Sequence, residues 1–115
     1  MWQGIDKRRF PRVNYPCRII VTQKDRKASF KTQTENIGVG GVCVVLEKGF
    51  DRFTEVYLEI FIEGSHIPLK CRGRIVWVIK RASSEKRKPN QFDTGIEFID
   101  LKDEDRLRIE KIVER

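Results

Sequence analysis

Hydrophobic and polar residues alternate along most of this chain with a period of two, which is typical of β-strands that bury one face. The clearest case is segment 55–63, where Val56, Leu58, Ile60 and Ile62 share one face. Alternation of the same kind, or a short apolar run between polar segments, predicts five more strands, at residues 17–23, 28–37, 42–46, 67–79 and 92–99.

The end of the chain changes to a helical pattern. We expect Asp100 to cap a helix that runs to Arg115, because acidic residues follow it where the helix dipole is positive. Leu101, Ile109 and Ile112 would supply its apolar stripe. Six strands at short spacing and one final helix predict a mainly β fold, a six-stranded antiparallel β-barrel with a C-terminal α-helix.

The longest predicted strand, 67–79, has two notable positions. Gly73 lies in its middle and suggests a bulge or sharp bend, which a small barrel needs. Trp77 is in phase with Ile67 and Ile75, and this phase favours packing of its ring in the core.

A basic arm precedes the strands. We divide the chain into this arm, residues 1–14, and a barrel domain, residues 15–115. The arm carries Lys7, Arg8, Arg9 and Arg12 but few hydrophobic residues that could join a core, so we expect it to be flexible without a ligand. The chain as a whole has a net charge of +7 and a pI of about 9.6, which favours an anionic partner without identifying it.

Several classes of function lack their sequence signals. The three cysteines form no close pair and the chain has one histidine, His66, so neither a disulfide framework, a metal site nor a cofactor is expected. No catalytic or phosphate-loop motif is present, which argues against an enzyme. No apolar run approaches the ~20 residues of a membrane span, and no signal peptide is evident, so we expect a cytoplasmic protein without membrane insertion.

Two short motifs carry the candidate chemistry. The first is Arg8-Arg9-Phe10-Pro11-Arg12, and the second is the glycine-rich segment Asn36-Ile37-Gly38-Val39-Gly40-Gly41 after a predicted strand. Guanidinium groups bind phosphates and the O6/N7 edge of guanine with two hydrogen bonds. Glycine lets backbone N–H groups approach a ligand closely. Together the motifs predict a site for a guanine nucleotide that carries phosphodiesters.

At these residues the chain resembles the PilZ domain family, whose signature is RxxxR followed by (D/N)xSxxG. Arg8 and Arg12 fit the first half, while Asn36, Gly38 and Gly41 occupy the D/N, S and G positions of the second. Gly38 therefore departs from the family pattern. The resemblance covers nearly the whole chain, and it implies a small β-barrel that binds cyclic dimeric GMP (c-di-GMP), a bacterial second messenger.

The resemblance also implies roles for the basic residues and for Asn36. Arg8 and Arg12 would clamp guanine and phosphate, Arg9 would make a secondary contact, and Lys7 fills the basic position before the motif. Asn36 would offer its carbonyl oxygen to N–H donors of guanine, although a simple turn-forming role is an alternative.

The other implied positions depend on backbone and ring geometry. Gly41 would sit in a tight turn without room for a Cβ, and Gly40 would add flexibility. Gly38 cannot supply the hydroxyl of a serine, a loss of about 0.5–1.5 kcal/mol, so binding should be weakened roughly tenfold or less. Trp77 would stack on a guanine, and packing in the core remains its alternative.

The resemblance predicts a second-messenger receptor that signals to an unidentified downstream protein when c-di-GMP orders the arm, in bacterial motility or biofilm regulation. One alternative is a ligand-independent adaptor in pilus or motility machinery, against which the intact RxxxR counts. The other is a small nucleic-acid-binding β-barrel. It is less favoured because the aromatic residues are scattered and do not form a stacking row.

Overall fold

Residues 12–82 and 90–114 are described in the computed structural model, and most of them lie in strands. The elements are β1 (Arg12–Val13), β2 (Arg18–Gln23), β3 (Ser29–Gly38), β4 (Gly41–Leu46), β5 (Glu55–Phe61), β6 (Leu69–Lys80), β7 (Phe92–Phe98) and α2 (Asp103–Val113). The alternation of buried and exposed residues along β2, β5 and β6 is the physical cause of their strand structure, since a strand places successive side chains on opposite faces.

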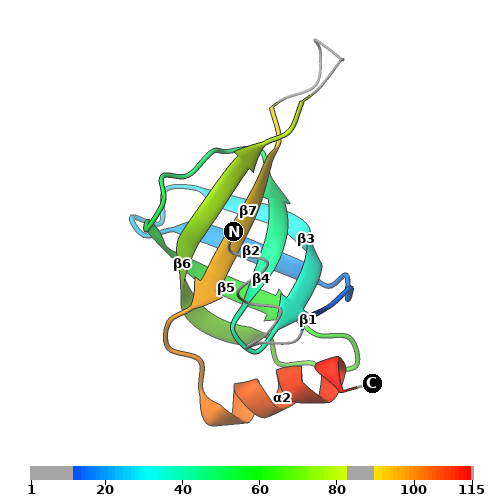
Figure 1. The fold of residues 1–115 in the computed structure, drawn as a ribbon. Coiled ribbons are helices and arrows are strands. Elements are labelled where there is room, and N and C mark those ends of the chain that lie inside the picture. Colours follow the sequence, from blue (N-terminus) through cyan, green and yellow to red (C-terminus); the bar gives the residue numbers. More distant parts are fainter. Residues whose placement is uncertain (1–11, 83–89, 115) are drawn as a thin grey trace.

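The strands form a closed antiparallel barrel (Figure 1). Neighbouring strands follow the order β3-β2-β5-β6-β7-β4, and β4 pairs with β3 to close the ring. The short strand β1 also pairs with β3, beyond the end of β2. Helix α2 lies across the lower end of the barrel in Figure 1. The six-stranded antiparallel barrel and the C-terminal helix predicted from the sequence are confirmed.

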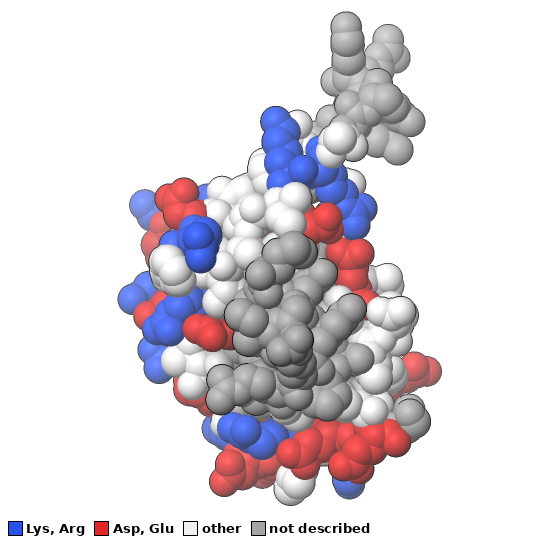
Figure 2. Space-filling view, viewed as in Figure 1, with Lys and Arg blue, Asp and Glu red and all other residues white. Residues whose placement is uncertain are grey.

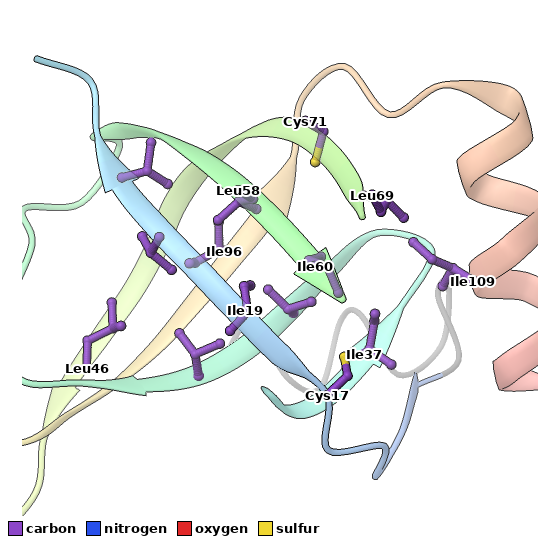
Figure 3. Packing of buried hydrophobic residues seen from close by; sticks show 14 of the residues in the cluster. Cys17, Ile19, Ile37, Leu46, Leu58, Ile60, Leu69, Cys71, Ile96 and Ile109 are labelled. Carbon is purple, nitrogen blue, oxygen red and sulfur yellow. The ribbon is translucent and has the colours of Figure 1, made fainter. Parts of the chain in front are cut away.

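The core fills the barrel with aliphatic side chains from every strand of the ring (Figure 3). Val56, Leu58 and Ile60 of β5 are at most 1% exposed, as the alternation predicts. Ile109 extends from α2 toward the barrel end near Leu69, and it is fully buried. Helix α2 is therefore held by its apolar stripe, because burying an aliphatic side chain stabilises by about 1.5–3 kcal/mol.

Strand β6 differs from the predicted strand 67–79 in its start and in the place of its bulge. Ile67 lies outside the strand and its side chain is 73% exposed, so it takes no part in the core. Gly73 is buried and pairs with Phe98 in regular register, so no bulge lies there, and the irregularity falls between Ile75 and Trp77. Val76 is thus the extra residue of a β-bulge.

Asp100 does not cap the helix. The residue before α2 is Lys102, which makes no side-chain capping bond. The Asp100 carboxylate instead accepts hydrogen bonds from the Arg72 backbone N–H at 2.6 Å and from Arg72 Nε at 3.1 Å. The charged arginine donor and the strand N–H together compete successfully for this carboxylate, and the helix begins three residues later.

Candidate functional site

A bulge in β3 turns Asn36 to the outer surface of the barrel. Thr34 pairs with Val44 and Asn36 pairs with Cys43, so Glu35 is the extra residue. Thr34 points inward, where it is 2% exposed and its hydroxyl donates to the Tyr15 carbonyl at 2.7 Å. After the bulge, Asn36 is on the outside. A bulge of this kind reorients a side chain without ending the sheet.

The Asn36 carboxamide oxygen is buried, and no hydrogen bond to it is made in the part of the chain that the structure describes. A buried acceptor without a donor costs about 1–3 kcal/mol. Such an atom is therefore suited to receive an N–H from a bound molecule.

The second bulge, in β6, turns Trp77 to the same outer face. Val78, the next residue, packs against the core instead. The bulge is held by the loop before β5, because the Phe53 N–H donates to the Ile75 carbonyl at 2.6 Å and Arg52 Nε donates to the Val76 carbonyl at 3.2 Å. The sequence allowed two interpretations of Trp77, stacking on a guanine or packing in the core. Packing in the core was wrong, because the side chain lies on the outer face.

One row of paired residues connects Asn36 to Trp77 across four strands. Asn36 pairs with Cys43, Cys43 pairs with Gly95, and Gly95 pairs with Trp77. Directly paired residues of neighbouring strands lie on the same face. We call this row, from Asn36 through Cys43 and Gly95 to Trp77, the ligand face. Sequence reasoning named neither Cys43, which is buried, nor Gly95 as part of this row.

The two motifs meet beside the ligand face. In the β1–β3 ladder, Arg12 pairs with Gly38 and Val13 pairs with Ile37. The backbone of the second RxxxR arginine therefore lies next to the middle of the glycine-rich segment. Lys7, Arg8 and Arg9 lie outside the described residues.

The glycine-rich segment leads from β3 into β4. The Gly40 carbonyl accepts a hydrogen bond from the Phe98 N–H at 2.9 Å. A Cβ on Gly41 would collide with the backbone carbonyl of Ile96 on β7. Gly41 indeed has no room for a side chain, but the reason is the close approach of β7 rather than a tight turn.

Charged side chains flank the ligand face on both sides. On one side Arg81 contacts Glu35 at 3.2 Å and Asp93 at 3.0 Å. On the other side Arg74 contacts Glu97 at 3.2 Å. Figure 2 shows the barrel from the same side as Figure 1. Lys and Arg side chains gather near the upper end of β6, and Asp and Glu side chains lie along α2.

Burial raises the pKa of the Glu35 carboxyl, and a hydrogen bond and charge repulsion from Asp93 raise this pKa further. Arg81 acts in the opposite direction on the same pKa. The three side chains therefore form one electrostatic unit at the edge of the ligand face.

A separate hollow lies on the wall formed by β2, β5 and β6. Tyr57 and Arg72 line it, and Arg26 lies over the Tyr57 ring at 4.7 Å. Arg72 is already paired with Asp100 and, at 3.5 Å, with Glu55. Neither Asn36 nor any residue of the glycine-rich segment lines this hollow.

Two other features are absent from the described residues. Within ranges 12–82 and 90–114, no three His, Cys, Asp or Glu side chains gather as a metal site requires. No helix in the same ranges has the length and apolar character needed to cross a membrane. The ligand face offers an indole ring, a buried and unsatisfied amide acceptor, and backbone close to arginines, a set suited to a base and a phosphate.

The comparisons with known proteins agree on one family. The family model of the PilZ domain matches residues 6–115. A comparison with curated protein sequences gave no match.

Among solved structures, the PilZ domain of YcgR from Escherichia coli with c-di-GMP superimposes with a TM-score of 0.71 at 12% identity, covering 94% of this chain and 89% of that one. The Bacillus subtilis inhibitor of motility MotI/DgrA gives 0.73 at 14% identity over 92% of this chain. This chain spans about half (49%) of that protein's length. The PilZ domain of CeSA from a cellulose-synthesizing bacterium gives 0.56 at 20% identity, covering 90% and 94%. At these identities the structures establish the fold.

Proposed function

The chain belongs to the PilZ domain family, and from this premise we propose that it is a c-di-GMP receptor whose ligand binds on the face from Asn36 to Trp77. The family supplies the ligand class, and the neighbours include the YcgR domain with c-di-GMP. The proposal covers binding and signalling, without an enzymatic step.

The observation that carries the proposal is the pairing of Arg12 with Gly38. It places the second arginine of RxxxR beside the NxGxxG segment, although Arg12 and Gly38 are 26 positions apart in the sequence. Antiparallel pairing fixes the register of the backbone to within one residue. This pairing therefore supports a site in which residues of both motifs contact the same ligand molecule.

Each group on the ligand face has a counterpart in c-di-GMP. The Asn36 carbonyl oxygen accepts an N–H of guanine, and this bond would satisfy an acceptor that is otherwise open. Trp77 offers a ring for stacking on a base. Arg8 and Arg12 bind the phosphodiesters and a guanine edge, with Arg9 and Lys7 adding positive charge. Gly38, Gly40 and Gly41 keep the backbone close to the ligand.

Signalling follows from ordering of the arm. Residues 1–14 close over the ligand and thereby change the surface that a downstream protein recognises. A role in motility is consistent with the neighbour described as an inhibitor of motility, and biofilm regulation is a further expectation. The cytoplasm is the compartment in which such a receptor would meet its messenger.

Isothermal titration tests the proposal with three ligands. We expect c-di-GMP to bind with a dissociation constant of about 1 μM or tighter, and GTP and single-stranded DNA to bind far more weakly. Absence of heat with c-di-GMP at about 100 μM would reject the receptor and favour the ligand-independent adaptor. Stronger binding of single-stranded DNA would favour the nucleic-acid-binding barrel.

A further inference from the structure

A pair of carboxylates lies at the edge of the ligand face. Glu35 is the extra residue of the β3 bulge and directly precedes Asn36. Asp93 is two residues before Gly95 on β7, which is about 7 Å along a strand. Both carboxylates contact the same guanidinium group, that of Arg81.

The position of Arg81 is fixed by the backbone. Its N–H donates to the Gln91 carbonyl at 2.8 Å, which continues the β6–β7 ladder past the end of both strands. From there the guanidinium reaches Glu35 on β3 and Asp93 on β7, so one side chain spans β4. All three charged side chains are partly exposed, at 28–42%.

These carboxylates present a problem for an anionic ligand. c-di-GMP carries two phosphodiester charges, and two further negative charges within about one Debye length, ~8 Å at physiological salt, would repel it. Like charges at such distances weaken binding by a measurable amount even in high dielectric. The ligand face therefore needs a cation that compensates Glu35 and Asp93.

We propose that Arg81 is a positioning residue of the c-di-GMP site, which offsets one of the two negative charges of Glu35 and Asp93 and keeps the Glu35 carboxylate away from the Asn36 acceptor. The inference rests on the proposed function and deepens it. Arg81 needs no contact with the ligand in this role. It reduces the repulsion between the ligand face and phosphate, and it leaves the Asn36 oxygen unsatisfied and available to guanine.

The titration of Glu35 supports the same role. The groups that face its carboxyl are Asp93 on β7, Arg81 after β6, and Cys43 on β4, whose sulfur is 4.0 Å from a Glu35 oxygen. Burial and Asp93 raise the pKa of Glu35, and Arg81 lowers this pKa. Without Arg81 the Glu35 carboxyl would take up a proton more readily as the pH falls, and its repulsion of the ligand would then disappear.

The test compares c-di-GMP affinity in matched variants. Arg81→Ala should weaken binding roughly tenfold at 0.1 M salt, and by less than about threefold at 1 M salt, where the Debye length is ~3 Å. Glu35→Gln combined with Arg81→Ala should restore affinity to within about threefold of wild type, because one repelling charge is gone. In Arg81→Ala alone, affinity should recover as the pH falls from 7 to 5.

Arg18→Ala is the control variant. It removes the same charge from the opposite wall of the barrel and should leave the affinity for c-di-GMP within about twofold of wild type.

The outcomes separate this inference from the proposed function. If wild type does not bind c-di-GMP, the proposed function fails. If wild type binds and Arg81→Ala binds equally well, the receptor stands and the role of Arg81 is rejected. A loss of affinity that neither salt, pH nor Glu35→Gln relieves would assign Arg81 a structural or direct contact role and would also overturn the inference. Circular dichroism of each variant checks that the barrel is folded.

Discussion

The indole of Trp77 lies directly across Gly95 on the neighbouring strand, so that a β-carbon on Gly95 would collide with the Nε1 and Cε2 atoms of the ring. The two residues are paired in the β6–β7 ladder, immediately after the bulge at Val76. The glycine thus provides the flat surface on which the ring rests. This contact fixes Trp77 on the ligand face rather than in the core.

Gly95→Ala should therefore displace the Trp77 ring. We expect a loss of about 1–3 kcal/mol in the free energy of unfolding, because the added methyl group overpacks a site without space. Weaker c-di-GMP binding should accompany it. Denaturant unfolding of Gly95→Ala, Trp77→Ala and the double variant measures the coupling. The cost of Gly95→Ala should fall by at least about 0.5 kcal/mol when Trp77 is already alanine. Equal costs in both backgrounds would show that the ring is not the obstacle.

Arg8 and Arg12 should matter more for binding than Gly38. Arg8→Ala or Arg12→Ala should cost about 2–5 kcal/mol of c-di-GMP binding, the amount lost with a charge-assisted contact, without lowering the melting temperature. Gly38→Ser should leave affinity unchanged or improve it, since among the described glycines a positive φ occurs at Gly64 rather than at Gly38. Titration calorimetry and thermal melts measure both quantities. Wild-type affinity in Arg12→Ala would show that the site is assigned wrongly.

Asn36→Ala should separate binding from stability. Since the structure shows no donor to the Asn36 oxygen within the described residues, its removal should not destabilise the barrel and should relieve a buried, unsatisfied acceptor. Binding of c-di-GMP should weaken roughly tenfold, the equivalent of one hydrogen bond. Titration calorimetry of this variant measures its affinity for c-di-GMP, and thermal melts measure its stability. A melting temperature that falls while affinity is unchanged would instead assign Asn36 a structural role in β3.

Much of the fold could be predicted from the sequence because strand alternation is local. In β5, for example, each buried residue is followed by a more exposed one, and the pattern alone gave the inward face correctly. The closed barrel and its final helix followed from the number and spacing of such segments. The assignment of Trp77 to the core was wrong because alternation, as a local pattern, does not reveal a bulge. Its phase with Ile75 is correct only in a regular strand, and one bulge residue, Val76, reverses it.

The candidate site was only partly accessible from sequence. The signature residues Asn36, Gly38 and Gly41 could be named, but the row that links Asn36 to Trp77 depends on the register of four strands. Register of this kind is determined by long-range pairing, which no local pattern contains. The same holds for Asp100, whose sequence neighbourhood suits a helix cap but whose partner, Arg72, is 28 residues away.

The Asp100–Arg72 contact predicts a pH dependence of stability. Hydrogen bonds from the Arg72 N–H and guanidinium lower the pKa of Asp100 in the folded state. The contact therefore stabilises the fold above the unfolded pKa of about 3.9, and this contribution is lost as the pH falls through the lower, folded pKa. Asp100→Asn should be less stable than wild type at pH 7, by no more than about 1 kcal/mol for so exposed a pair, and the difference should vanish near pH 2.

Chemical denaturation from pH 2 to pH 7 measures this difference. Asp103→Asn, at the first residue of α2, serves as the matched control, because it removes one carboxylate and leaves the Asp100–Arg72 contact intact. A difference between wild type and Asp100→Asn that stays constant over the whole range would mean that the carboxylate charge plays no part.

Closure of the arm is the step by which the receptor would signal, and hydrogen exchange tests it directly. Without ligand we expect low protection of residues 5–11, because this part of the arm carries few core hydrophobics, whereas Arg12 and Val13 already pair with β3. With c-di-GMP, protection should rise at 5–11 and 36–41 and stay nearly constant at 55–63, which includes β5. Ordering the arm costs about 1–2 kcal/mol for each residue fixed, so only charge-assisted contacts to phosphate and guanine can offset it. Affinity should therefore fall as salt rises. Equal protection of the arm with and without ligand would indicate a preformed site, and signalling by ordering of the arm would have to be abandoned.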